Sequence, residues 1–248
     1  MRTLFAMSLC LLLTPVQSPV QRPRDPWVFR SVLDQRPRMV SIALSSEMWV
    51  AYDATWCGLY KAWKGGVHFD GAVYTTVHGP QPTSEGTAYL QGRDGTAWSA
   101  TSSDGKTSAL TPRWRGYLLQ KGEVRLQYDL KLADGTVVRV EETPEFVRPE
   151  KLADDPTSLA PWLSKGLVGL RRTFTATGIP AGQTISIAIQ AECVGYLMER
   201  LSGVEDREAS FPDGSVGRSL SASVPLDAAA PRNELMLFFK PAPDPKSK

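Results

Sequence analysis

The sequence lacks several motifs that would assign a chemistry directly. It contains no Cys-x-x-Cys-His run, which excludes covalent attachment of c-type haem to this chain. A Gly-rich phosphate-binding loop and a Gly-x-Ser-x-Gly nucleophile elbow are also missing. Neither a nucleotide-binding motif of the usual kind nor an α/β-hydrolase motif is therefore indicated, and we expect no bound cofactor.

An excess of charge of one sign is missing as well. Lys and Arg number 28 against 26 Asp and Glu, the formal net charge is +2, and no long basic run occurs. Nucleic-acid binding is therefore not indicated. Hydrophobic residues make up 42% of the 248 residues, which is enough to fill the core of one large domain.

The longest apolar run is short and stands at the N-terminus. It reads LFAMSLCLLLTPV and follows Met1-Arg2-Thr3, whereas a membrane-spanning helix needs about 20 apolar residues. A basic start followed by a short apolar run is typical of a secretory signal peptide. We expect export to the periplasm or the cell exterior, cleavage between Ser18 and Arg24, and no membrane span after cleavage. An uncleaved N-terminal anchor is the alternative.

Cysteine is rare, with three residues in the whole chain. Removal of Cys10 with the signal peptide leaves Cys57 and Cys193, an even pair in an oxidising compartment. A Cys57–Cys193 disulfide is therefore permitted. The alternative is two separate buried thiols that act as small hydrophobic side chains.

The pattern of short β-rich segments, frequent Gly and Pro turns and no convincing long helix predicts an all-β fold. We expect an antiparallel β-sandwich of roughly ten or more strands, formed by a single domain over residues 25–240. Residues 1–24 are the signal peptide and lead, and residues 241–248 are a polar, Pro-rich tail. Strands are expected at 39–44, 48–52, 59–63, 167–176, 184–191 and 234–240, with 167–176 and 184–191 paired and a turn at Gly65-Gly66. The segment 78–103 is expected to be mainly loop, with two short strands around 88–90 and 96–100.

The clearest local prediction is a hairpin over residues 123–142. Apolar and polar residues alternate from Val124 to Leu132, the period of a half-buried strand. A three-residue Ala133-Asp134-Gly135 turn pairs Leu130 with Val138 and keeps the apolar residues on one face. The same parity puts Glu142 on that apolar face, where a carboxylate needs a partner or a ligand.

Aromatic side chains are concentrated in residues 47–82, and they suggest a binding site. Aromatic rings stack on sugar rings, while nearby polar groups supply hydrogen bonds. The aromatic candidates are Trp56, Tyr60, Trp63, Tyr74, Trp98, Trp114 and Tyr117. The site that we predict comprises Trp63, Lys64, His68, Asp70, Tyr74 and His78, together with Trp114, Arg115 and Glu142. Core packing is the alternative role for each aromatic residue.

Catalytic and metal-binding alternatives have less support in the sequence. Glu141 and Glu142 are adjacent on one strand and face opposite ways, so they cannot be the convergent carboxylate pair of a glycosidase. His68, Asp70 and His78 are metal-ligand types, but a structural zinc site usually has more numerous and more tightly spaced ligands. We predict no metal site.

Three stretches resemble a known type of domain. They are WVAYD at 49–53, LYKAWKGGV at 59–67 and FDGAVY at 69–74, and the later WRGY at 114–117 and VEETP at 140–144 fit the same pattern. Together they resemble a domain of unknown function from secreted bacterial multidomain proteins. In those proteins the domain often stands ahead of a c-type cytochrome or a sugar-hydrolase-like β-sandwich. The resemblance covers about residues 25–240 and implies a cytochrome-containing or other secreted partner.

These observations favour an exported, non-catalytic binding or accessory domain with carbohydrate as the first ligand class to test. One alternative is a sugar-active enzyme of mutarotase or hydrolase type that uses His68 or His78 and Glu142 as acid and base. The other is a docking module for a periplasmic electron-transfer partner, which an apolar patch on one sheet face would favour.

Overall fold

The computed structural model describes residues 24–69, 74, 79–95, 97–148, 167–193, 198–199, 204–210 and 216–239. These residues form sixteen strands and no helix, and therefore no helix that is long and apolar enough to cross a membrane. The strands are β1 (Trp27–Leu33), β2 (Arg36–Ser45), β3 (Met48–Asp53), β4 (Gly58–His68), β5 (Thr83–Gly92), β6 (Trp98–Ser102), β7 (Thr107–Ala109), β8 (Pro112–Gln120), β9 (Glu123–Lys131), β10 (Val137–Val147), β11 (Val168–Thr177), β12 (Gln183–Cys193), β13 (Met198–Glu199), β14 (Val204–Ser210), β15 (Val216–Asp227) and β16 (Arg232–Phe239).

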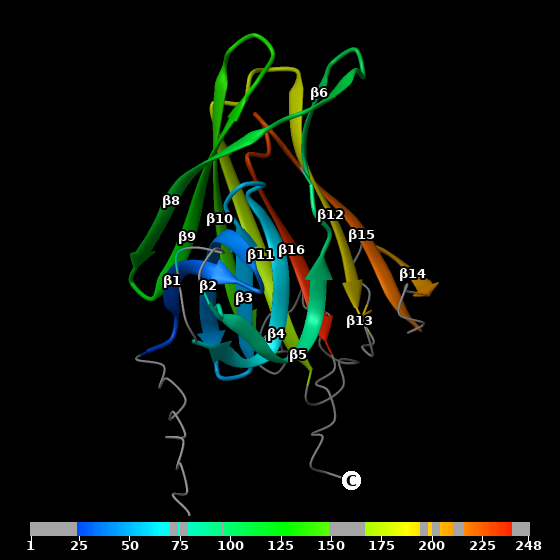
Figure 1. The fold of residues 1–248 in the computed structure, drawn as a ribbon. Coiled ribbons are helices and arrows are strands. Elements are labelled where there is room, and N and C mark those ends of the chain that lie inside the picture. Colours follow the sequence, from blue (N-terminus) through cyan, green and yellow to red (C-terminus); the bar gives the residue numbers. More distant parts are fainter. Residues whose placement is uncertain are drawn as a thin grey trace, which may run out of the picture.

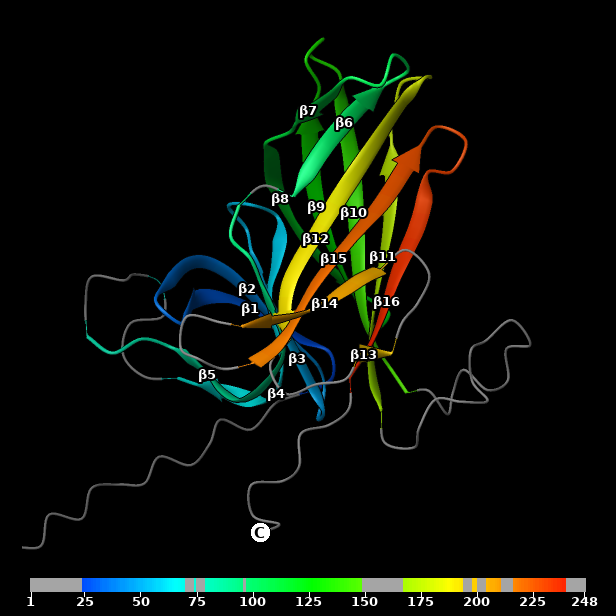
Figure 2. The same cartoon turned by 90° about the vertical axis from the view of Figure 1, so that its right-hand side faces the viewer.

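The strands make two antiparallel sheets that face each other. The larger sheet has the order β1-β2-β3-β4-β5-β12-β15-β14, with β6 beside β12 and β7 beside β6. The smaller sheet has the order β13-β16-β11-β10-β9-β8. Figure 1 shows the arrangement, and in Figure 2 strands β12 and β15 cross in front of β9 and β10. The predicted antiparallel β-sandwich is confirmed.

The main core lies between the two sheets. Alternate residues along each strand face inward and bury their side chains there, as expected for strands with one covered face. The larger sheet contributes Val40, Ile42, Val50, Tyr52, Leu90, Ile185 and Ile187, and the smaller sheet contributes Leu126, Tyr128, Leu130, Val138, Val140, Leu170 and Phe174.

A second, smaller core lies on the other face of β1–β4. Trp49 and Trp63 stack there with ring centroids 5.9 Å apart, and Trp27 and Phe29 of β1 pack against Trp49. Trp27 and Phe29 therefore anchor β1 to this second core. The β1–β2 turn reaches β5, where Asp34 accepts hydrogen bonds from the Ser84 amide at 2.7 Å and hydroxyl at 2.7 Å.

The hairpin β9–β10 has the predicted register. Leu130 pairs with Val138, and Gly135 has φ +89°, the left-handed conformation that the three-residue turn requires. The amide of Leu132 donates to the carbonyl of Thr136 at 2.8 Å, which closes the turn. This register places Glu142 on the core face, as the parity argument predicted.

Some local predictions are wrong. Gly65-Gly66 is not a turn, because both residues lie inside β4 and pair with Gly86 and Glu85 of β5. Strand β11 pairs with β10 and β16, and β12 pairs with β15, so the predicted strands at 167–176 and 184–191 exist but belong to opposite sheets. In the segment 78–103 the two short strands expected around 88–90 and 96–100 correspond to β5 and β6, but β5 is ten residues long, so the segment holds more strand than predicted. The signal segment over residues 1–23 and the tail at 241–248 lie outside the described residues.

Candidate functional site

Glu142 has the hydrogen-bonding partners in the core that its predicted position requires. Its Oε1 accepts hydrogen bonds from the Tyr52 hydroxyl at 2.6 Å and from Arg172 Nε at 2.6 Å. Its Oε2 accepts a hydrogen bond from the Tyr128 hydroxyl at 2.9 Å. Both carboxylate oxygens are therefore engaged, and the side chain is fully buried. Because Tyr52 belongs to the larger sheet and Glu142 to the smaller one, the cluster joins the two sheets.

The environment of this cluster controls its protonation. Burial raises the pKa of Tyr52 and of Tyr128 well above the usual range, and the nearby Glu142 charge raises both further. Burial opposes the charge on Arg172, but the Glu142 carboxylate outweighs that effect and raises the pKa of the guanidinium. The two tyrosines therefore stay neutral hydrogen-bond donors, while Arg172 stays charged.

Arg172 also borders a surface cleft. Its Nη2 atom is buried and has no hydrogen-bond partner among the described residues. The guanidinium carbon lies 5.7 Å from the Tyr52 ring centre and 5.1 Å from the Phe174 ring centre. A buried donor without a partner costs about 1–3 kcal/mol, so this atom favours a ligand or water that brings an acceptor.

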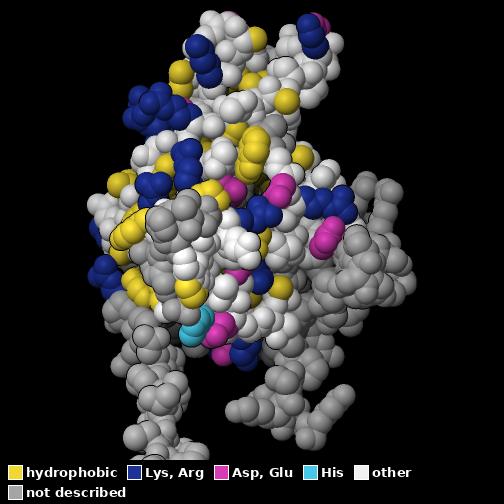
Figure 3. All heavy atoms as spheres, viewed as in Figure 1, with side chains coloured by type: hydrophobic (Ala, Val, Ile, Leu, Met, Phe, Trp, Pro, Cys, Tyr) yellow, Lys and Arg dark blue, Asp and Glu magenta, His cyan; other side chains and the backbone are white. Residues whose placement is uncertain are grey.

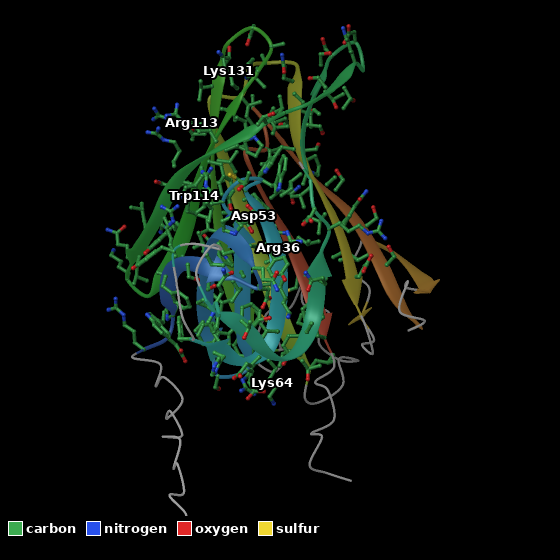
Figure 4. The ribbon with its side chains drawn as sticks, viewed as in Figure 1. Arg36, Asp53, Lys64, Arg113, Trp114 and Lys131 are labelled. Atoms are coloured by element: carbon green, nitrogen blue, oxygen red, sulfur yellow. The ribbon has the colours of Figure 1, made fainter. Side chains whose placement is uncertain are left out.

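The cleft lies between β2, β4, β5 and β12 of the larger sheet and has a volume of about 140 Å³. Its wall includes two aromatic residues, Trp56 and Tyr60, and Trp56 is 39% exposed. Arg36, Asp53 and Arg172 line it as well. Figure 4 shows Arg36 and Asp53 close together, and Figure 3 shows acidic and basic side chains intermixed near the middle of this face.

A two-point ion pair holds the rim of the cleft. Arg36 Nη1 and Nη2 donate to Asp94 Oδ1 at 2.5 Å and Oδ2 at 2.9 Å, which ties β2 to the segment after β5. The guanidinium of Arg36 lies 4.6 Å from the centre of the Tyr60 ring, and the Tyr60 hydroxyl donates to Asp34 at 3.0 Å. Tyr60 is therefore fixed on its face and at its hydroxyl. The hydrogen bond from Arg36 lowers the pKa of Asp94.

The members of the predicted site that the structure describes do not form one cluster. Trp63 is fully buried, and its Nε1 donates to the Gly66 carbonyl at 2.8 Å, so it cannot stack on a ligand. Lys64 pairs with Glu47 at 2.9 Å. His68 Nδ1 lies 3.6 Å from Glu85 at the exposed end of β4.

The other predicted members lie elsewhere. Trp114 and Arg115 belong to β8 of the opposite sheet, where Trp114 packs on Tyr128 and Arg115 lies 3.4 Å from Asp129. Figure 4 shows Trp114 well apart from Lys64. Tyr74 is 85% exposed. Asp70 and His78 lie outside the described residues, so their placement stays a prediction.

This arrangement also weakens the predicted acid and base roles. Glu142 is buried with both oxygens hydrogen-bonded, while His68 is half exposed and faces Glu85. Those two groups therefore do not form a catalytic pair. No group of three or more His, Cys, Asp or Glu among the described residues is arranged to hold a metal ion.

Cys57 carries a free, buried thiol, so the permitted Cys57–Cys193 disulfide is not formed in the structure. Its Sγ lies 3.8 Å from the Ala54 carbonyl oxygen, and the alternative of a buried thiol applies to it. The side chain of Cys193 lies outside the described residues. Burial, followed by the Glu142 charge, raises the pKa of Cys57 to about 12.

No protein-family model matches the chain, and no curated protein matches it. The resemblance to the domain from secreted bacterial proteins therefore stays a prediction, and a functional argument depends on the chemistry of the cleft.

Sequence reasoning weighed Trp56 and Tyr60 as ligand-stacking aromatics but missed the charged residues beside them. Arg36, Asp94 and Arg172 come from three distant parts of the chain, and no spacing rule connects them. One signal was present. The parity of the hairpin demanded a cationic or hydrogen-bonding partner for Glu142, and a buried arginine on the neighbouring strand is such a partner.

Proposed function

We propose that this chain is an exported, non-catalytic carbohydrate-binding domain that holds its ligand in the cleft beside Trp56. One small cleft is lined by the solvent-exposed Trp56, by Tyr60, which is held at its ring and hydroxyl, and by Arg172, which has a buried donor without a partner. This observation carries the proposal. The site differs from the one expected from sequence, while the ligand class is the same.

The size of the cleft supports a single ring as the bound unit. A closed cavity of about 150 Å³ holds one benzene molecule, and the cleft has a volume of about 140 Å³ and opens to solvent. One sugar ring can enter with its outer edge in water. The rest of a longer glycan would lie outside the cleft.

The chemistry of the walls fits a sugar ring as well. The Trp56 side chain offers an exposed apolar face, on which the C–H face of a sugar packs. Asp53 offers carboxylate acceptors for sugar hydroxyls, and Arg172 Nη2 offers a donor. A small number of placed polar groups around an aromatic wall is the usual composition of a ligand pocket.

The carboxylates of the cleft give little support to glycosidase chemistry. A general acid needs a raised pKa, but the contact with Arg36 lowers the pKa of Asp94. Glu142 is sealed in the core behind the cleft. These features favour binding without turnover.

A glycan array probed with the purified protein tests the proposal, with each bound glycan recovered and followed by NMR. Trp56→Ala should weaken binding by about tenfold to a hundredfold, because loss of a stacking ring removes about 1–3 kcal/mol. Tyr74→Ala is the matched control, since Tyr74 is an exposed aromatic residue outside the cleft lining. Circular dichroism should show both variants folded.

The outcomes separate the alternatives. A glycan that binds and is recovered unchanged supports the proposal when Trp56→Ala weakens it and Tyr74→Ala does not. Cleavage or interconversion of the sugar refutes the non-catalytic part. Failure to bind any glycan refutes the carbohydrate part and leaves a protein ligand to be tested.

A further inference from the structure

The cations that line the cleft are already paired with carboxylates. Arg36 pairs with Asp94 through two hydrogen bonds, and Arg172 pairs with the buried Glu142 at 2.6 Å. Arg93, the third arginine of the lining, lies 3.3 Å from Glu192. An additional carboxylate, Asp53, also faces the cleft and acts on Arg36.

The charge balance therefore leaves no arginine of the lining uncompensated. Three arginines stand against four carboxylates, namely Asp53, Asp94, Glu142 and Glu192. A ligand carboxylate would have to leave water and compete with these groups for a cation. Desolvating a charge without a free partner costs more than its attraction returns.

Hydrogen-bonding capacity remains even though the charges are balanced. A guanidinium has five N–H donors, and Arg172, which lines the cleft, uses Nε on Glu142 while its buried Nη2 has no partner among the described residues. A sugar hydroxyl is both donor and acceptor, so it can accept from Arg172 and donate to Asp53 without bringing a charge.

We propose that the cleft selects an uncharged sugar ring over an acidic one, and that Arg172 Nη2 donates a hydrogen bond to the deepest ligand oxygen. This inference rests on the proposed function, because it concerns the class of sugar that the same cleft accepts. Arg172 acts as a specificity-determining residue, held in place by its ion pair with Glu142 and by the rings of Tyr52 and Phe174.

Matched pairs of small ligands test this selection. The probes are the methyl glycosides of glucose, galactose and mannose and the corresponding methyl uronides, titrated into the full chain at pH 7 with binding followed by NMR. Each pair differs only in a hydroxymethyl group or a carboxylate. We expect the uncharged member to bind at least about tenfold more tightly, which is a difference of about 1.4 kcal/mol.

A variant with one charge removed from the cleft gives a second test of this selection. Asp94→Asn removes the hydrogen-bonded partner of Arg36 at an exposed side chain, so it takes one negative charge from the cleft and leaves Arg36 only the attraction of Asp53, without disturbing the core. The affinity ratio of uronide to neutral glycoside should rise by about twofold to fivefold, the effect of one exposed charge. Asp104→Asn is the control, because Asp104 is exposed and outside the cleft lining.

Each result decides one point. Uronides that bind as tightly as the neutral glycosides overturn the inference but leave carbohydrate binding intact. An unchanged ratio in Asp94→Asn also overturns it. If no glycoside and no uronide binds, and the glycan array also shows no binding, the proposed function fails and the inference fails with it.

A series of deoxy ligands tests the role of Arg172. Removal of single hydroxyls from the best neutral ligand should lower the affinity by about tenfold to a hundredfold at one position, the oxygen that pairs with Arg172.

Discussion

Arg172 and Glu142 form an ion pair at 2.6 Å between Nε and Oε1, and their side chains are only 1% and 0% exposed. The pair lies on adjacent strands of the smaller sheet, while Tyr52 reaches it from the larger sheet. One carboxylate thus fixes the relation between the two sheets at the level of the cleft. The energetic cost of burying both charges is offset only while all of these partners are present.

Glu142→Gln should therefore destabilise the protein strongly. The substitution removes the negative charge but leaves Arg172 buried and charged, and loss of one partner of a buried pair costs about 3–5 kcal/mol. Urea unfolding followed by circular dichroism measures the change. Glu145→Gln is the control on the same strand, because the Glu145–Arg171 pair is only partly buried and its loss should cost about 1 kcal/mol or less. Equal effects of the two substitutions would contradict the assigned role of Glu142.

Tyr52→Phe tests the link between the sheets. The change removes a hydroxyl that donates to Glu142 at 2.6 Å and keeps the ring that fills the core. A hydrogen bond to a charged group contributes about 1.5–3 kcal/mol, so the free energy of unfolding should fall by that amount. The double variant with Glu142→Gln should lose less than the sum of the single changes, since both act on one cluster. Strict additivity would show that the two groups are energetically independent.

The sequence predicts those parts of the fold that depend on local pattern. Alternation from Val124 to Leu132 predicts the hairpin, its turn and the inward position of Glu142, because period and turn length fix the register. The predicted pairing of β11 with β12 is wrong, because no local pattern shows which of two sheets a strand joins after a short connection. The cleft brings together Arg36, Trp56 and Arg172, which only the tertiary fold connects.

The β4–β5 pair depends on a close approach of backbones at Gly65. A Cβ atom at this position would lie 2.0 Å from the Glu85 carbonyl oxygen, and Gly65 has φ +137°. Gly65→Ala should therefore lower the free energy of unfolding by about 1–3 kcal/mol or more. The neighbouring Gly66→Ala is a control, since a Cβ there meets nothing within 4 Å, and its effect should stay within about 0.5 kcal/mol. Calorimetric melting of both variants compares them, and similar melting temperatures would argue against the close approach.

The Cys57 thiol should contribute to a loss of stability at alkaline pH. Substitution of Cys57 should remove this contribution. Burial raises the pKa of this thiol from 9.0 to about 12, and the Glu142 charge adds to the shift. The unfolded chain therefore releases the thiol proton near pH 9, whereas the native protein holds it until about pH 12. Between these values the unfolded state binds fewer protons, so the stability that the neutral thiol contributes is present below pH 9 and is lost as the pH rises.

The slope is at most about 1.4 kcal/mol per pH unit for one group. Urea unfolding at several pH values from 8 to 11 measures it in a Cys10→Ser/Cys193→Ser background, where Cys57 is the last of the three cysteines. Cys57→Ala in the same background is the comparison, and Tyr52 and Tyr128 contribute equally to both proteins. The stability difference between the two proteins should shrink steadily above pH 9, because only one of them contains the thiol. A difference that stays constant over this range would mean that the Cys57 thiol ionises equally in the native and unfolded states, and that it does not lie in the apolar site beside Glu142.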